Sequence, residues 1–313
     1  IRDIRARHDM VRSIIEDDDG FSPLRFVGTT RITEDIEAVA QRIKDALSIT
    51  DDRELRRGRN TPDDLFAELR ARVERIGVFV LLAGNLGTHH TNISEKVFRG
   101  FAIADALAPF IVINDQDAKA ARSFTLIHEL VHIFVGSTGV SGAPTTVEPR
   151  TPLARVEKFC NDVAGEVLLP RAVLPQAVRL EDADEAIALA AGIADFWKVS
   201  EAMVAYRLWQ AGKMSGETYV DVVAIYSARW QTFRDRAREA AREEDRSGPS
   251  YYTVRRHRLG NSLLSLVGRT LRANEVTHTK AAKMLGVKTS GVEPLLAGVE
   301  GLGGPTPNVR GRD

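Results

Sequence analysis

The spacing of apolar and polar positions along the chain predicts helices interrupted by a small sheet. Apolar side chains at helical spacing predict four helices in the first two thirds of the chain, over residues 33–47, 61–75, 124–135 and 156–170. Thr33 is a candidate N-cap for the first, and Thr61 followed by Pro62 opens the second. Three short apolar, β-branched runs predict strands at 77–82, 99–105 and 108–114. This mixture predicts an α+β fold.

The two ends of the chain have a different composition from this middle part. Residues 1–20 are dense in charge, which is typical of a solvated helix or of a link to a segment upstream of Ile1. Residues 228–246 interleave arginines with acidic residues, as an exposed helix with i,i+4 ion pairs does. We expect a division into an N-terminal extension, a folded domain, a helical basic region and a disordered tail, over residues 1–30, 31–215, 216–300 and 301–313.

One segment, 124–135, carries the residues with the clearest chemistry. His128, Glu129 and His132 follow the pattern His-Glu-x-x-His. Residues four apart share one face of a helix, so both imidazoles can bind a single Zn²⁺ while Glu129 reaches a water as general base. The alternative is a core helix that carries these residues by chance. The apolar flanks favour a metal site, because burying three ionisable side chains without a metal is costly.

The segment 156–170 supplies a candidate for the third ligand that a catalytic zinc requires. Glu157 is that candidate, with a solvated helix charge as the alternative interpretation. Asn161 lies one turn further on the same face, where it can accept the hydrogen bond that orients a ligating histidine. Cys160 shares this face. A thiolate there can bind metal or be oxidised, but a small buried apolar side chain is the interpretation we favour.

These two segments resemble the ImmA/IrrE-type metallopeptidases. The resemblance rests on residues 124–132, 157–161 and 167–170, and on the strand-like stretches 99–105 and 108–114 before them, and it extends over residues 31–215. It implies a zincin-like domain, with a small sheet and the HExxH helix, that acts as a gluzincin-like endopeptidase with Zn²⁺. Known members of the family cut a helix-turn-helix repressor. The resemblance therefore implies such a partner, encoded nearby, and a role in a stress, DNA-damage or phage-defence response.

Two features of substrate handling remain open at this level. An extended peptide can bind by adding to an exposed sheet edge, and we expect that edge within residues 99–105, with an ordinary structural strand as the alternative. A tetrahedral intermediate also needs an oxyanion donor besides the metal. The sequence offers four candidates and does not choose among them: Tyr206, Arg207, His89 and His90. The two histidines are in a turn-rich loop, where solvent-facing side chains are usual.

Composition limits the alternatives. The 313 residues are 43% hydrophobic, enough for a substantial core. Basic and acidic side chains balance at 43 each, which argues against nucleic-acid binding by the protein as a whole. A single cysteine rules out an intramolecular disulfide, and no long apolar span is present, so we expect a cytoplasmic protein with no membrane partner.

The segment 251–292 has a surplus of positive charge and suggests a second activity. Tyr251 and Tyr252 stand beside Arg255, Arg256 and Arg258, a combination that can stack on bases and neutralise phosphates of single-stranded DNA, here as an activator. Residues 279–292 resemble a helix-turn-helix unit. The alternative is a helical hairpin packed on the catalytic domain with a solvated basic face.

Two other classes of function therefore compete with the peptidase. One is a DNA-binding transcription regulator whose peptidase-like domain is sensory or inactive, and the other is a structural zinc protein. Glu129 argues against the structural site, because such a site gains nothing from a general base beside it.

Overall fold

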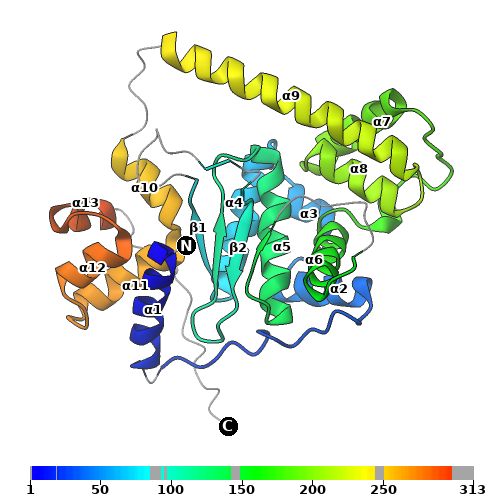
Figure 1. Ribbon diagram of the computed structural model, residues 1–313. Helices are drawn as coiled ribbons and strands as arrows, with labels where there is room; N and C mark the ends of the chain where they lie inside the picture. Colours follow the sequence, from blue (N-terminus) through cyan, green and yellow to red (C-terminus); the bar gives the residue numbers. More distant parts are fainter. Residues whose placement is uncertain are drawn as a thin grey trace.

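The computed structural model describes residues 2–18, 20–84, 93–94, 97–141, 149–243 and 250–297. Within these residues a four-stranded sheet, in the order β1-β3-β2-β4, forms the centre of the molecule (Figure 1). The strands are β1 (Phe79–Leu82), β2 (Gly100–Ile103), β3 (Phe110–Ile113) and β4 (Gly139–Ser141). β1 is parallel to β3, and β2 is antiparallel to both β3 and β4. The predicted α+β class is confirmed.

Both faces of the sheet are covered by helices, and the side chains of β1, β2 and β3 alternate between two cores. On β1, Val80 and Leu82 enter the first core, whereas Phe79 and Leu81 enter the second. Buried strands of this kind carry apolar residues at every position, which explains the continuous apolar runs in the sequence. The first core is completed by α2 (Ile36–Ala46), α3 (Asp52–Arg56), α4 (Pro62–Arg75), α5 (Arg122–Val135), α6 (Pro152–Leu168), α7 (Ala183–Trp197) and α8 (Glu201–Gln210).

The second core joins the two ends of the described chain. Helix α1 (Arg2–Glu16) lies beside the C-terminal helices in Figure 1. These are α10 (Tyr251–Leu259), α11 (Asn261–Arg272), α12 (His278–Leu285) and α13 (Val292–Leu296). Ile4, Val11, Ile14 and Ile15 of α1 are buried in this core. The prediction of a solvated helix or a link over residues 1–20 is therefore wrong for one face of α1. That face carries apolar residues at helical spacing and is buried, while most of the charged residues of the helix are exposed.

Local capping explains where the predicted helices begin. Thr61 Oγ1 accepts a hydrogen bond from the amide of Asp64 at 3.2 Å, and the Asp64 carboxylate accepts one from the amide of Thr61 at 2.9 Å, so α4 starts with a capping box before Pro62. Helix α2 starts later than predicted. Its N-cap is Asp35, which accepts from the amide of Ala38 at 2.9 Å, and not Thr33.

The exposed sheet edge differs from the prediction. β2 lies between β3 and β4, with Gly100 opposite Ser141 and Ala102 opposite Gly139. The expectation of a free edge within residues 99–105 is therefore wrong, because the three-residue strand β4 already pairs with that side. Among the described strands, the outer ones are β1 and β4.

The long helix α9 (Gly216–Glu243) packs on α7 and α8 and then extends across one end of the molecule (Figure 1). The side chains of its second half that the structure describes are mostly exposed, with Phe233 at 60% exposure, which confirms the prediction of an exposed helix for that part. Arg229 pairs across to Glu201 of α8 at 3.9 Å. No described helix has the length and apolar character needed to cross a membrane. The predicted tail, 301–313, lies outside the described residues.

Candidate metal centre

Helix α5 brings the two histidines of the HExxH pattern together. The helix ends at Gly136, whose φ of +76° is a left-handed conformation that favours glycine. His128 and His132 lie one turn apart on the face that meets α6, and their Nε2 atoms are 3.1 Å apart. His128 is 2% exposed and His132 is 0% exposed. The pair is therefore buried and faces a neighbouring helix.

Helix α6 supplies the carboxylate that completes the group. Thr151 caps its first turn, Pro152 occupies the first helical position, and the next turn presents Glu157 to the two imidazoles. Glu157 Oε2 lies 3.3 Å from His128 Nε2, and Glu157 Oε1 lies 3.2 Å from His132 Nε2. Among the described residues, these three form the group whose ligand atoms all fall within 4.8 Å of one another. The sequence-based grouping of the three side chains is thus reproduced in space.

The spacing of these atoms fits a tetrahedral metal. Zinc binds histidine nitrogen and carboxylate oxygen at about 2.0–2.2 Å, which places neighbouring tetrahedral ligands roughly 3.3–3.6 Å apart. The two Nε2 atoms are 3.1 Å apart, and each lies 3.2 or 3.3 Å from a different oxygen of Glu157, distances close to that edge length. Two histidines and a glutamate are also the donor set of catalytic zinc sites that keep one position open. The residues present therefore fit Zn²⁺.

Electrostatics in this group favour the protonation states that bind metal. Burial lowers the pKa of His128, and the neighbouring His132 lowers it further. The carboxylate of Glu157 opposes both effects and raises the pKa of His128. Burial opposes ionisation of Glu157, but hydrogen bonds from His128 and His132 lower its pKa to about 2. A neutral imidazole and an ionised carboxylate are the forms that donate electron pairs to a metal.

Glu129 is fully buried and is held in place from the side of β2. A side-chain carbon added at Gly100 would lie 2.7 Å from Glu129 Oε1 and 2.8 Å from Thr125 Cγ2. Gly100 therefore leaves the space that the Glu129 carboxylate occupies. Gly100 was not among the predicted site residues, although a glycine inside a predicted strand is a sign of close approach by another group.

Two further residues of α6 lie close to the cluster. The amide of Asn161 interacts with His128 and favours the protonated imidazole, which is the placement expected of an orienting residue. The role itself stays a prediction, because Asn161 Oδ1 and His128 Nδ1 have no hydrogen-bond partner among the described residues. Cys160 is buried, and burial together with the nearby Glu157 raises the pKa of its thiol well above the usual value. This supports the favoured interpretation of a small buried apolar side chain.

The oxyanion candidates have other roles or lie outside the described residues. Tyr206 donates to Asp162 of α6 at 2.7 Å. Arg207 donates to the carbonyl of Leu169 at 3.0 Å and pairs with Glu166. Both side chains therefore make contacts that hold α8 against α6 and the C-cap residue that follows it. His89 and His90 fall in a stretch that the structure does not describe.

The C-terminal arginines make contacts within the protein. Arg255 donates to the carbonyls of Leu285 and Gly286 at the end of α12, and Arg256 donates to those of Pro294 and Ala297 at the end of α13. Arg258 donates to Asp115 Oδ2 at 2.7 Å.

Positive charge at helix C-termini is stabilising, which accounts for Arg255 and Arg256 without nucleic acid, and Arg258 is paired with a carboxylate of the protein itself. Tyr251 remains 62% exposed, with its ring edge-on to Tyr252. Of the helix-turn-helix predicted over residues 279–292, the first helix and the glycine turn are found as α12 and a left-handed Gly286, whereas the second helix, α13, has five residues and begins only at Val292. Its use in DNA binding stays a prediction.

Comparison with known proteins agrees with this geometry. Residues 75–209 match the family model described as the IrrE N-terminal-like domain, Peptidase_M78. These residues are a domain of the ImmA/IrrE family. The match runs from the end of α4 to α8, so the IrrE-type domain includes the sheet, α5, α6 and all three residues of the cluster. No curated protein and no solved structure matches the chain. The family is one of metallopeptidases, whereas the roles of individual residues rest on the geometry.

Proposed function

We propose that the protein is a zinc-dependent endopeptidase of narrow specificity, with His128, His132 and Glu157 as metal ligands and Glu129 as general base. The observation that carries the proposal is the convergence of ligand atoms from two buried histidines and a glutamate, all within 4.8 Å of one another, inside an IrrE-type domain. When bound, zinc would polarise the scissile carbonyl and make a water nucleophilic at neutral pH.

The residues of the chain have distinct tasks in this reaction. Glu129 accepts a proton from the attacking water and passes it to the leaving amine, a role that is typically worth about 10²–10⁴ in rate. Its complete burial next to Gly100 restricts its rotation and excludes bulk water. Asn161 orients His128 through the ring nitrogen that does not face Glu157.

The outer strand β4 is the edge at which an extended substrate would add. It starts at Gly139, and a side-chain carbon there would lie 3.8 Å from both Glu157 Oε1 and His132 Cε1. A peptide paired with β4 would therefore pass beside the cluster, with main-chain hydrogen bonds holding its register. The resemblance to ImmA/IrrE peptidases makes a helix-turn-helix repressor encoded nearby the first substrate to test, and a stress, DNA-damage or phage-defence response the setting.

Single-stranded DNA is a proposed activator with weaker structural support. Exposed Tyr251 favours it, but the internal contacts of Arg255, Arg256 and Arg258 leave fewer free donors for phosphates than the sequence suggested. A DNA-binding regulator with an inactive peptidase-like domain is the alternative, favoured by the helix-turn-helix geometry around Gly286.

The proposal is tested by a cleavage assay with the product of the neighbouring repressor gene. Glu129→Gln keeps the shape of the side chain but cannot take the proton, so we expect wild-type metal content and a loss of cleavage of at least about 10²-fold. Glu239→Gln, an exposed change on α9, is the matched control and should cleave as the wild type does. Undiminished cleavage by Glu129→Gln would assign the base elsewhere.

A further inference from the structure

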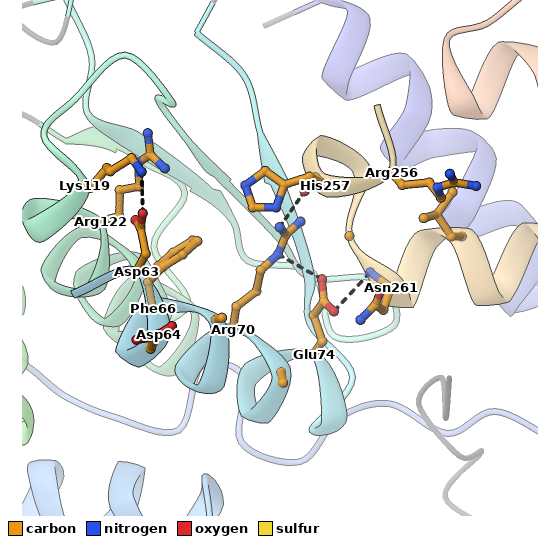
Figure 2. Close-up of a pocket in the computed structure, with 14 residues that line it drawn as sticks. Asp63, Asp64, Phe66, Arg70, Glu74, Lys119, Arg122, Arg256, His257 and Asn261 are labelled. Atoms are coloured by element: carbon orange, nitrogen blue, oxygen red, sulfur yellow. Dashed lines mark hydrogen bonds and ion pairs between the residues drawn. The ribbon is translucent and has the colours of Figure 1, made fainter. Parts of the chain in front are cut away.

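A cavity separate from the metal centre lies where the C-terminal helices meet the IrrE-type domain (Figure 2). Its volume is about 640 Å³, within the range of sites that hold small organic ligands. It is lined by α4, by the start of α5 with the short turn before it, and by α10 and α11. Phe66, Ala67 and Ala71 of α4 and Leu264 of α11 give it an apolar part.

One side of the cavity is cationic. Figure 2 shows Lys119 and Arg122 together on that side, with His257 between them and Arg70. Arg122 donates to the carbonyl of Asp115 at 2.8 Å, while its Nε is buried without a partner among the described residues. Lys119 contacts Asp63 at 2.6 Å, and this pair is largely exposed. A guanidinium has five N–H donors and an ammonium three, so several donors remain for a ligand.

The acidic side chains that line the cavity already accept hydrogen bonds from other groups of the protein. Asp64 accepts the amide of Thr61 in the capping box of α4. Glu74 accepts from Arg70 and from the amide of Asn261, a chain of contacts drawn in Figure 2. Partial burial and the guanidiniums of Arg70 and Arg122 lower the pKa of His257, and they outweigh the carboxylates of Asp115 and Asp63, which act in the opposite direction. The site around His257 is therefore electropositive, and an anion there would relieve the repulsion.

We propose that this cavity binds a nucleotide, with its phosphate against Lys119, Arg122 and His257 and its base against the apolar part formed by α4 and Leu264. A small inorganic anion would make no contact with the apolar part of the cavity. A purely apolar ligand would leave the basic side chains without an anionic partner. The phosphate can come from a free mononucleotide or from the phosphorylated end of a single strand. Both present the same chemistry to the site.

Isothermal titration calorimetry of the zinc-loaded protein tests the proposal with AMP, ATP and adenosine. A second arm uses a four-nucleotide oligothymidylate with or without a 5′-phosphate. We expect the phosphorylated ligands to bind at least about tenfold more tightly than the unphosphorylated ones, since a single hydrogen bond to a charged group contributes about that factor or more. Binding of AMP shows a mononucleotide site, and binding of only the phosphorylated oligonucleotide shows a strand-end site.

Variants assign the binding to this cavity. Arg122→Gln and Lys119→Gln should each weaken binding of the phosphorylated ligand about tenfold or more. Lys119→Gln removes only an exposed pair, so it keeps the test valid if Arg122→Gln folds poorly. The matched controls are Arg236→Gln on α9 and Lys283→Gln on α12, both exposed and outside the lining of the cavity, and they should bind as the wild type does.

A second measurement reports on the site directly. Bound phosphate should raise the pKa of His257, as followed by NMR of its ring protons. Absence of binding by every phosphorylated ligand, equal affinity for adenosine and AMP, or wild-type affinity in both cavity variants would overturn the proposal. None of these measurements requires peptidase activity, so their failure leaves the proposed peptidase function untouched.

Discussion

Replacing Gly100 by alanine tests whether the packing of β2 positions the general base. The added carbon would lie 2.7 Å from Glu129 Oε1, 2.8 Å from Thr125 Cγ2 and 3.0 Å from Glu129 Cγ. Carbon contacts are favourable at about 3.5–4.0 Å, so Glu129 or the strand must move by close to 1 Å. Overpacking of a buried site costs about 1–3 kcal/mol, and a misplacement of about 1 Å can lower turnover roughly 10²-fold. Gly100 has no positive φ, so the effect is steric.

Three measurements on Gly100→Ala separate an effect on packing from an effect on catalysis. Urea unfolding should show a free energy of unfolding lowered by about 1–3 kcal/mol, and elemental analysis should show one zinc per chain as in the wild type. Cleavage of the repressor substrate should fall about 10²-fold. Gly192→Ala in α7 is the control, because nothing lies within 4 Å of the added carbon, and it should raise stability by about 0.5–1 kcal/mol with normal cleavage. Wild-type stability and turnover in Gly100→Ala would refute the positioning argument.

Three further changes probe the rest of the fold. Arg70→Met should lower the free energy of unfolding by about 3–5 kcal/mol, because it leaves Glu74 buried without its ion pair, and Arg70→Met/Glu74→Leu should recover part of that loss in the same urea titration. Lys198→Gly should raise the melting temperature, since Lys198 holds a left-handed φ of +57° that costs about 1–2 kcal/mol for a non-glycine residue; a lower melting temperature would contradict this. Ile15→Ala should cost about 2–5 kcal/mol if α1 is part of the second core, and a cost below about 1 kcal/mol would return α1 to the role of a loose extension.

The site could be predicted from sequence because its geometry is local. His128 and His132 are one helical turn apart, so their shared face follows from the helix alone, and Glu157 follows from the chemistry of a third ligand. Asn161 lies one turn beyond Glu157 on α6, but its orienting role stays a prediction. Gly100 could not, since its role depends on how β2 crosses α5.

The predictions that were wrong concern features that depend on contacts between residues far apart in the sequence. β4 contains only Gly139–Ser141, too short a run to show a strand period, so its pairing with β2 was not foreseen. Tyr206 binds Asp162, and Arg255 binds the end of α12, contacts between residues far apart in the sequence. In α1 the signal was present, because Ile4, Val11 and Ile15 repeat at helical spacing, but the surrounding charge obscured it.

Anomalous diffraction at the zinc absorption edge tests the central claim most directly. Crystals of the protein grown with zinc should show one strong peak about 2.0–2.2 Å from His128 Nε2, His132 Nε2 and a carboxylate oxygen of Glu157. That result would place the metal on the three atoms that the structure brings within 4.8 Å of one another. The account would be contradicted if no peak were found between these side chains or if the zinc were bound elsewhere on the chain.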